Sequence, residues 1–157
     1  MKEEAIHKYY YKLLQTPRIQ QFIAKVRQPC SAGCDIHRYE FSPILQVVDT
    51  LGVNVAGLAV GYQRLRLSRW VLADERVAKG TVRHELAHAL KHYARLNGTH
   101  HGKEYYRVLR IVSPKKWQLD KYWYPTAKIE EARAKYHKIK PEFRKSRIKQ
   151  LQKLGLE

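Results

Sequence analysis

Residues 81–96 read TVRHELAHALKHYARL, and Asn97-Gly98 follows them. On a helix with about 100° per residue, the apolar side chains at positions 82, 86, 89, 90, 93 and 96 gather into one stripe. Thr81 can cap the first turn, and Asn97-Gly98 tolerates the left-handed backbone that often ends a helix. The stretch therefore predicts a helix over 81–96.

This predicted helix carries an HExxH motif, His84-Glu85-Leu86-Ala87-His88. Two histidines four residues apart are separated by about 40° around a helix, so both imidazoles can reach one cation. Glu85 is angled away from such an ion but is close enough to hold a water molecule beside it. Both histidines lie off the apolar stripe, which disfavours a role in the core. The pattern is typical of zinc hydrolases, with two nitrogen ligands and a carboxylate base.

A catalytic zinc ion usually has three protein ligands and one open position, so a third ligand is needed. Asn97-Gly98 lets the chain reverse and brings a histidine back over the motif helix. We expect His101 to be this ligand because it starts the next predicted helix. His100 is the neighbour most easily confused with it. His92 is either a substrate-facing or supporting group or a solvated surface residue.

From residue 53 to 109 the sequence resembles the SprT-like (Spartan-type) zinc metalloproteases. Their pattern is HExxH, a variable loop, and then His-Gly-Pro-Glu before Phe or Trp; here the second part reads HGKEY over 101–105. The resemblance implies that His84, His88 and His101 bind one zinc ion and that Glu85 is the catalytic base. Glu104 and Tyr105 match the family's Glu-aromatic pair.

The sequence departs from that pattern in three places. Lys103 replaces the usual Pro, and Tyr105 replaces Phe or Trp. The chain has no Cys after Cys34, so it lacks the paired Cys motifs of the zinc ribbon that many members carry. A further side chain could stabilise the negative charge that forms on the substrate's carbonyl oxygen during hydrolysis. The candidates are Tyr105, Tyr106 and His92, and the sequence does not choose among them.

The fold that the resemblance implies is α+β and of minimal zincin type. Its motif helix would pack on a small, mostly antiparallel sheet, with a helical N-terminal region and a basic C-terminal extension. We expect a metalloprotease domain over 1–112 and a basic, aromatic-containing extension over 113–157.

Periodicity predicts the other elements. A helical region spans 5–26, which Pro17 can break. Ser42-Pro43 is a helix-start signal and predicts a helix over 44–51. Residues 62–68 alternate with period two, which indicates a half-buried strand whose edge near Leu65 can receive an extended substrate. Further helices are expected over 102–112, 126–136 and 141–154, and a short helical lead-in over 74–79.

The charge of the chain points to a polyanionic partner. There are 31 Lys and Arg against 14 Asp and Glu, a net charge of +17, and residues 103–157 hold +10 of it. Such a balance favours nucleic acid, and we expect non-specific contact with DNA. The candidate contacts interleave cations with aromatic residues or lie in the basic tail: Lys115, Lys116, Trp117, Lys121, Trp123, Arg144, Lys145 and Arg147. Their other interpretation is an aromatic cluster in the core with solvated lysines.

Several other classes are disfavoured by the sequence. No apolar run approaches the roughly 18 residues of a membrane span, and no secretory signal follows Met1. Cys30 and Cys34 cannot build a disulfide framework, and with His37 their spacing is loose for a metal site, so two thiols are favoured. We expect a protein of the cytoplasm, nucleoid or nucleus, neither secreted nor membrane-spanning, that acts on protein substrates.

The leading hypothesis is a zinc-dependent endopeptidase acting on DNA-associated proteins. Two alternatives stay open: a nucleic-acid-binding protein with a structural zinc site, and a zinc hydrolase with a non-peptide substrate. Glu85 separates the first alternative from the enzyme, because a structural site closes its coordination and has no use for a carboxylate that activates water.

Overall fold

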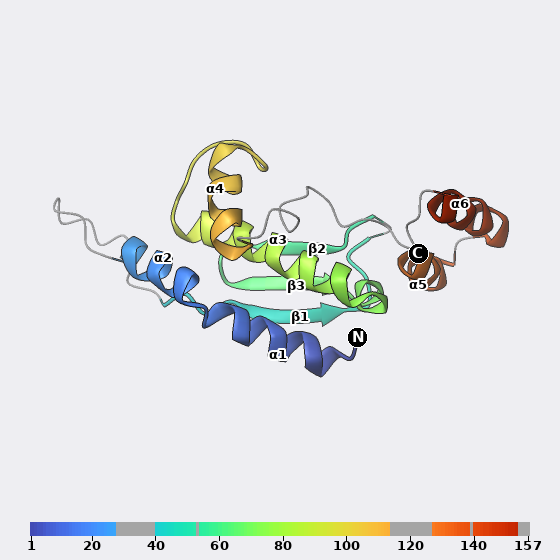
Figure 1. Ribbon diagram of the computed structural model, residues 1–157, viewed down its shortest axis with the longest axis horizontal. Coiled ribbons are helices and arrows are strands. Elements are labelled where there is room, and N and C mark those ends of the chain that lie inside the picture. The colour runs from blue at the N-terminus through green and yellow to red at the C-terminus, as the bar shows by residue number, and fades with distance from the viewer. Residues whose placement is uncertain (28–39, 53, 114–126, 139, 154–157) are drawn as a thin grey trace.

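The computed structural model describes residues 1–27, 40–52, 54–113, 127–138 and 140–153 (Figure 1). These residues form α-helices, one short 3-10 helix (η1) and three strands, which confirms the predicted α+β class. In chain order they are α1 (Glu3–Leu14), α2 (Pro17–Arg27), β1 (Ile44–Val48), β2 (Gly57–Val60), β3 (Arg64–Ser68), η1 (Arg69–Ala73), α3 (Glu75–Tyr93), α4 (Lys103–Val112), α5 (Ala127–His137) and α6 (Pro141–Lys153). None of the described helices combines the length and the apolar character needed to cross a bilayer.

The sheet is mixed, with strand order β1-β3-β2. Strand β3 pairs in parallel with β1 and antiparallel with β2, so the expectation of a mostly antiparallel sheet was wrong. The order also corrects the expected substrate edge. Leu65 lies in the central strand, where both edges are already paired, and β2 is an edge strand instead.

Strand β1 occupies the stretch for which the sequence predicted a helix over 44–51. The N–H of Ile44 donates to the carbonyl of Gln63 at 2.9 Å, and the register then runs from Ile44 opposite Arg64 to Val48 opposite Ser68. Three of its five residues are β-branched, a composition that suits a pleated, half-buried surface. Pairing with β3 therefore overrides the local start signal of Ser42-Pro43, as tertiary contacts often override propensity.

Helices α1 and α3 run across one face of the sheet (Figure 1). The inward-facing Leu45, Leu65 and Leu67 belong to one buried core with residues of α3 such as Leu86 and Leu90. The hydroxyl of Tyr10 donates to the carbonyl of Pro43 at 2.6 Å, which ties α1 to the start of β1. Burial raises the pKa of this hydroxyl, so it stays protonated as a donor.

Helix α3 begins earlier and ends earlier than predicted. Asp74 caps it, because its Oδ1 accepts the N–H groups of Arg76 at 2.9 Å and Val77 at 3.2 Å. The expected cap, Thr81, lies inside the helix, where its hydroxyl donates to the carbonyl of Val77. The helix ends at Tyr93, and the expected stop at Asn97-Gly98 falls in the following loop. The predicted lead-in over 74–79 is thus the first turn and a half of α3.

The other predicted helices are confirmed within one to three residues at each end. Pro17 separates α1 from α2, as expected. Helix α5 packs against η1, and its Ile129 is fully buried in the main core although it lies beyond residue 112. A domain boundary near residue 112 stays a prediction. The Cys30, Cys34 and His37 group lies outside the described residues.

Candidate metal centre

Three histidine rings converge between the middle of α3 and the segment just before α4. The Nε2 atoms of His84 and His88 are 3.2 Å apart, and the Nε2 of His101 is 3.1 Å from each of them. In the described part of the chain, these three form the cluster of His, Cys, Asp or Glu side chains with the spacing of a metal site. The rings predicted from the motif are therefore brought together at their nitrogens.

The nitrogen triangle fits a metal ion. Nitrogens bound to one tetrahedral zinc ion at ~2.0–2.1 Å lie roughly 3.3–3.4 Å apart. The observed spacing of 3.1–3.2 Å is close to that value. Three neutral imidazoles that point their Nε2 atoms at one another bring lone pairs together, and a shared cation removes that repulsion. The donor set, three imidazole nitrogens, is one that zinc accepts.

The histidines of this cluster are held in the neutral form that binds metal. Burial lowers the pKa of His84 to about 4, with smaller effects from His101 and His100. Burial also lowers the pKa of His88 to about 2, and neighbouring imidazoles add to the shift. The pKa of the more exposed His101 is lowered too, again mainly by burial. Protons therefore compete weakly with a metal ion at this site.

His101 rather than His100 completes the triangle. Gly98 adopts φ +105°, a left-handed value that favours glycine, as the chain turns between α3 and α4. His101 then lies just before the start of α4 and points its Nε2 at the pair on α3. The ring of His100 stacks on that of His88 instead, with centroids 4.1 Å apart and planes 22° apart. This choice between neighbours agrees with the expectation from sequence.

Glu85 is buried against the sheet. Its side chain accepts a hydrogen bond from the backbone N–H of Ala59 in β2, and only 7% of the residue is exposed. Burial raises the pKa of Glu85 to about 7, while the bond from Ala59 acts in the opposite direction. A carboxylate with a pKa near neutrality can both take up and release a proton under ordinary conditions.

Gly57 explains how β2 comes so close to α3. A Cβ added at Gly57 would lie 2.7 Å from Cγ2 of Thr81 and 2.8 Å from Cγ of Glu85. Glycine is thus required for the approach that lets Ala59 reach the carboxylate. The sequence offered a signal, since a glycine inside a β-branched stretch often marks a close backbone approach.

Gly57→Ala is expected to destabilise the fold by ~1–3 kcal/mol, because the added methyl overpacks the contact with α3. It should also displace Glu85. Gly80→Ala is the matched control: it lies in α3 and its added Cβ meets nothing within 4 Å, so it should stabilise the helix by about 0.5–1 kcal/mol. Urea unfolding of both variants checks the pair. Equal effects of the two substitutions would contradict the close approach at Gly57.

Tyr105 supports His84 of the histidine triangle. Its hydroxyl lies 2.8 Å from Nδ1 of His84, and the residue is almost fully buried. Because the Nε2 of His84 faces the other histidines, its Nδ1 carries the proton and donates to the Tyr105 hydroxyl oxygen. Burial raises the pKa of Tyr105, so it remains a neutral phenol. Its ring also stacks on His88 with centroids 4.3 Å apart.

Tyr105→Phe is expected to weaken zinc binding by about 10–100-fold, the usual effect of losing a partner that orients a metal ligand. The ring contacts remain, so folding stability should change little. Competition with a zinc-chelating dye measures the affinity. Tyr106→Phe is the control, since Tyr106 contacts Tyr105 edge-on and, within the described residues, forms no hydrogen bond to any of the three histidines. A Tyr105 variant with wild-type affinity would remove Tyr105 from the support of the site.

Lys91 holds the loop that delivers His101. Its Nζ donates to the carbonyls of Gly98 at 3.1 Å and Thr99 at 2.9 Å. These bonds join the last turn of α3 to the segment just before His101, the third corner of the triangle. The sequence reasoning missed Lys91, because a lysine on a helix surface carries no signal of a loop contact.

Lys91→Met is expected to lower zinc affinity about tenfold, as for other groups that orient a ligand, while Lys91→Arg retains most of it. Lys91→Met in a His101→Ala background should have no further effect on zinc affinity, because Lys91 acts through His101. Zinc competition on the wild type, the two single variants and the double variant tests this. Additive losses would mean that Lys91 does not act through His101.

The remaining candidates lie around the centre without joining it. His92 is exposed and faces Tyr62, with ring centroids 6.1 Å apart. Glu104 forms an ion pair with Arg107 within α4, at 3.1 Å. Most of the candidate DNA contacts lie outside the described residues: Lys115, Lys116, Trp117, Lys121 and Trp123, and the side chains of Arg144 and Arg147. Lys145 is exposed on α6.

Comparison with known proteins bears on this arrangement. The profile of the SprT-like family matches residues 4–125, a range that includes all three histidines and Glu85. No curated protein and no solved structure matches the chain. Since the matched range covers most of the 157 residues, the chain belongs to the SprT-like family.

Proposed function

We propose that the protein is a zinc-dependent endopeptidase in which His84, His88 and His101 hold the ion and Glu85 is the general base. The observation that carries the proposal is the triangle of Nε2 atoms 3.1–3.2 Å apart, with a buried carboxylate on the residue next to one ligand. Membership of the SprT-like family supports a metalloprotease-type domain.

The chemistry divides between the ion and the protein. A zinc ion bound here would act as a Lewis acid that makes water nucleophilic near neutral pH and polarises a carbonyl. The Glu85 carboxylate takes the proton from the attacking water and then gives it to the leaving amine. The N–H of Ala59 keeps this carboxylate oriented. Tyr105 keeps His84 in the tautomer that presents Nε2 to the ion.

The position of β2 supports a peptide as substrate. Strand β2 pairs with β3 on one side, and in the described residues its other side carries no strand. Ala59 of this edge strand bonds Glu85, so the edge runs beside the base. An extended peptide that pairs with a free strand edge gains backbone hydrogen bonds whatever its sequence. A substrate bound along β2 would thus lie next to the catalytic carboxylate.

The ligand set supports catalysis over a purely structural zinc site. Structural zinc sites have four protein ligands, whereas catalytic sites have three and an open position. Among the described residues, no fourth His, Cys, Asp or Glu joins the histidine triangle. Glu85, the nearest acid in the sequence, is bonded to Ala59 instead.

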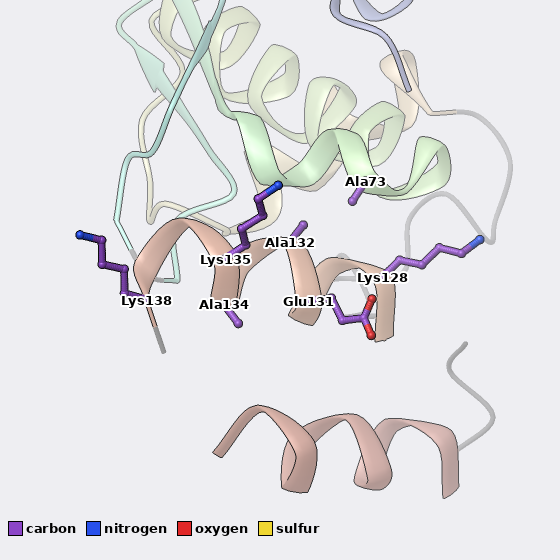
Figure 2. Close-up of a pocket in the computed structure, with 7 residues that line it drawn as sticks. All are labelled: Ala73, Lys128, Glu131, Ala132, Ala134, Lys135 and Lys138. Atoms are coloured by element: carbon purple, nitrogen blue, oxygen red, sulfur yellow. The ribbon is translucent and has the colours of Figure 1, made fainter. Parts of the chain in front are cut away.

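DNA-associated proteins are the substrates that the charge of the chain favours. The net charge is +17. Lys128 and Lys135 of α5 and Lys138 just after it are exposed and, together with Glu131, line a hollow of about 720 Å³ beside Ala73 (Figure 2). Such lysines can contact phosphates without reading sequence.

The test uses the full chain, zinc-loaded and chelator-treated, on unfolded casein with and without single-stranded DNA. We expect cleavage with zinc only, faster with DNA, and DNA affinity that falls steeply with salt. Zinc and DNA binding without any cleavage would favour a structural site. Cleavage of a simple ester but of no protein or peptide would favour a non-peptide substrate. Cleavage that DNA leaves unchanged would reject DNA-associated proteins as the preferred substrates.

A further inference from the structure

The face of the sheet opposite α3 carries two rows of side chains. Paired residues of neighbouring strands point to the same side of a sheet. The register therefore sets Ile44, Arg64 and Val60 in one row across the three strands. It sets Gln46, Arg66 and Leu58 in the next row. Each row has an arginine on the central strand between the side chains of the two edge strands.

No described element covers this surface, which we call the outer sheet face (Ile44, Gln46, Leu58, Val60, Arg64 and Arg66). Ile44 is 57% exposed, Leu58 45% and Val60 41%, although large aliphatic side chains are usually buried. Aliphatic groups that gather on one face, with charges among them, mark interaction surfaces more often than scattered ones do. On the opposite face, Leu65 and Leu67 of the central strand are fully buried.

The two arginines are available to an anionic partner. Neither Arg64 nor Arg66 forms an ion pair within the described residues. The Nε of Arg66 donates to Oε1 of Gln46 at 3.3 Å, which orients its guanidinium on the face. A guanidinium binds a carboxylate with two parallel hydrogen bonds, and it loses less hydration than an ammonium when it does so.

The composition of the outer sheet face selects among partners. A second copy of the chain would bring arginine against arginine, with a charge of +17 on each chain. Nucleic acid gains from aromatic side chains on which bases stack, and none of the six positions is aromatic. A partner that carries carboxylates next to aliphatic side chains would complement both the arginines and the aliphatic residues of this face. An acidic amphipathic helix carries both kinds of side chain, and helices commonly cover the face of a sheet.

We propose that the outer sheet face docks an acidic amphipathic helix of a partner protein, whose Asp or Glu side chains pair with Arg64 and Arg66 while its aliphatic side chains cover Ile44, Leu58 and Val60. The histidine triangle and Glu85 lie on the α3 side of the sheet, so a docked helix leaves the metal centre open. The surface thus provides a site for recruitment separate from the catalytic one. The inference stands on the sheet alone and does not require the protein to be a peptidase.

The test measures binding of a fluorescein-labelled 20-residue helical peptide with Leu and Glu on one face and Ala and Gln on the other. Two matched peptides replace its Glu by Gln or its Leu by Ser. We expect Arg64→Glu/Arg66→Glu to lower the affinity of the full chain at least tenfold, and Leu58→Ser/Val60→Ser to lower it severalfold. If charge reversal impairs folding, the neutral double variant Arg64→Gln/Arg66→Gln replaces it, and it should also lower the affinity for the peptide.

The control is Arg18→Glu/Lys25→Glu, which makes the same change of charge at exposed positions of α2. It should alter the affinity less than twofold. An equal loss in this control would show general attraction to a basic protein and overturn the proposal. So would a Leu58→Ser/Val60→Ser variant with unchanged affinity. A 20-nucleotide oligo-dT that binds the wild type and loses affinity in the arginine variants, while the peptide does not, would assign the face to nucleic acid.

Discussion

His101→Ala is expected to abolish hydrolysis and to weaken zinc binding by more than about 100-fold. Losing a group that only orients a metal ligand typically costs about 10–100-fold, and losing a ligand itself should cost more. His101 supplies one corner of the nitrogen triangle from outside α3, and two ligands four residues apart cannot hold a tetrahedral zinc ion alone. The residue is exposed, and truncating it removes one edge contact with the ring of Tyr105 but no buried side chain, so the fold should persist. Zinc competition and a casein assay measure the two losses, and the unfolding curve of chelator-treated protein checks the fold.

His100→Ala is the matched control for this prediction. His100 is adjacent in sequence and also exposed, but its ring stacks on His88 and its nitrogens do not enter the triangle. We expect a small change in affinity from the lost stacking. If His100→Ala lost zinc and His101→Ala kept it, the assignment of the third ligand would be reversed.

Glu85→Gln is expected to keep zinc bound and to lower kcat/KM for peptide cleavage by about 10²–10⁴-fold, the usual contribution of a general base. Glutamine has nearly the same shape and can still accept the N–H of Ala59, but it cannot take a proton from water. Because a buried carboxylate pays a desolvation cost that a neutral amide largely avoids, stability should not fall. Kinetics, zinc content and urea unfolding of one preparation give all three readings.

Glu75→Gln provides the comparison on the same helix. Glu75 is in the first turn of α3 and pairs with Lys79 at the surface, far along the helix from the motif. Its substitution should leave kcat/KM unchanged within about twofold, because an exposed pair contributes little. A Glu85→Gln protein that still cleaved at the wild-type rate would assign the base to another group.

The residues of the histidine triangle were predictable because they follow one another at short, recognisable spacings in the sequence. HExxH on an amphipathic stretch sets two imidazoles on one side of a helix through the 3.6-residue period alone. The loop with Asn97-Gly98 and the following His pair limited the third ligand to two neighbours. The helix ends were less predictable. Asp74 and Thr81 are both good N-cap residues, and the apolar stripe led to Thr81 where the structure uses Asp74.

The sequence by itself thus determined the family, the α+β class and the residues of the nitrogen triangle, because these depend on local period and motif. Only the tertiary structure decided that Ile44–Val48 is a strand and that Gly57 and Ala59 hold Glu85. It also decided that Lys91 and Tyr105 support the histidine triangle and that no described element covers one sheet face. Those features arise from contacts between segments distant in the chain. Their free energy depends on strand pairing and packing, which no window of neighbouring residues contains.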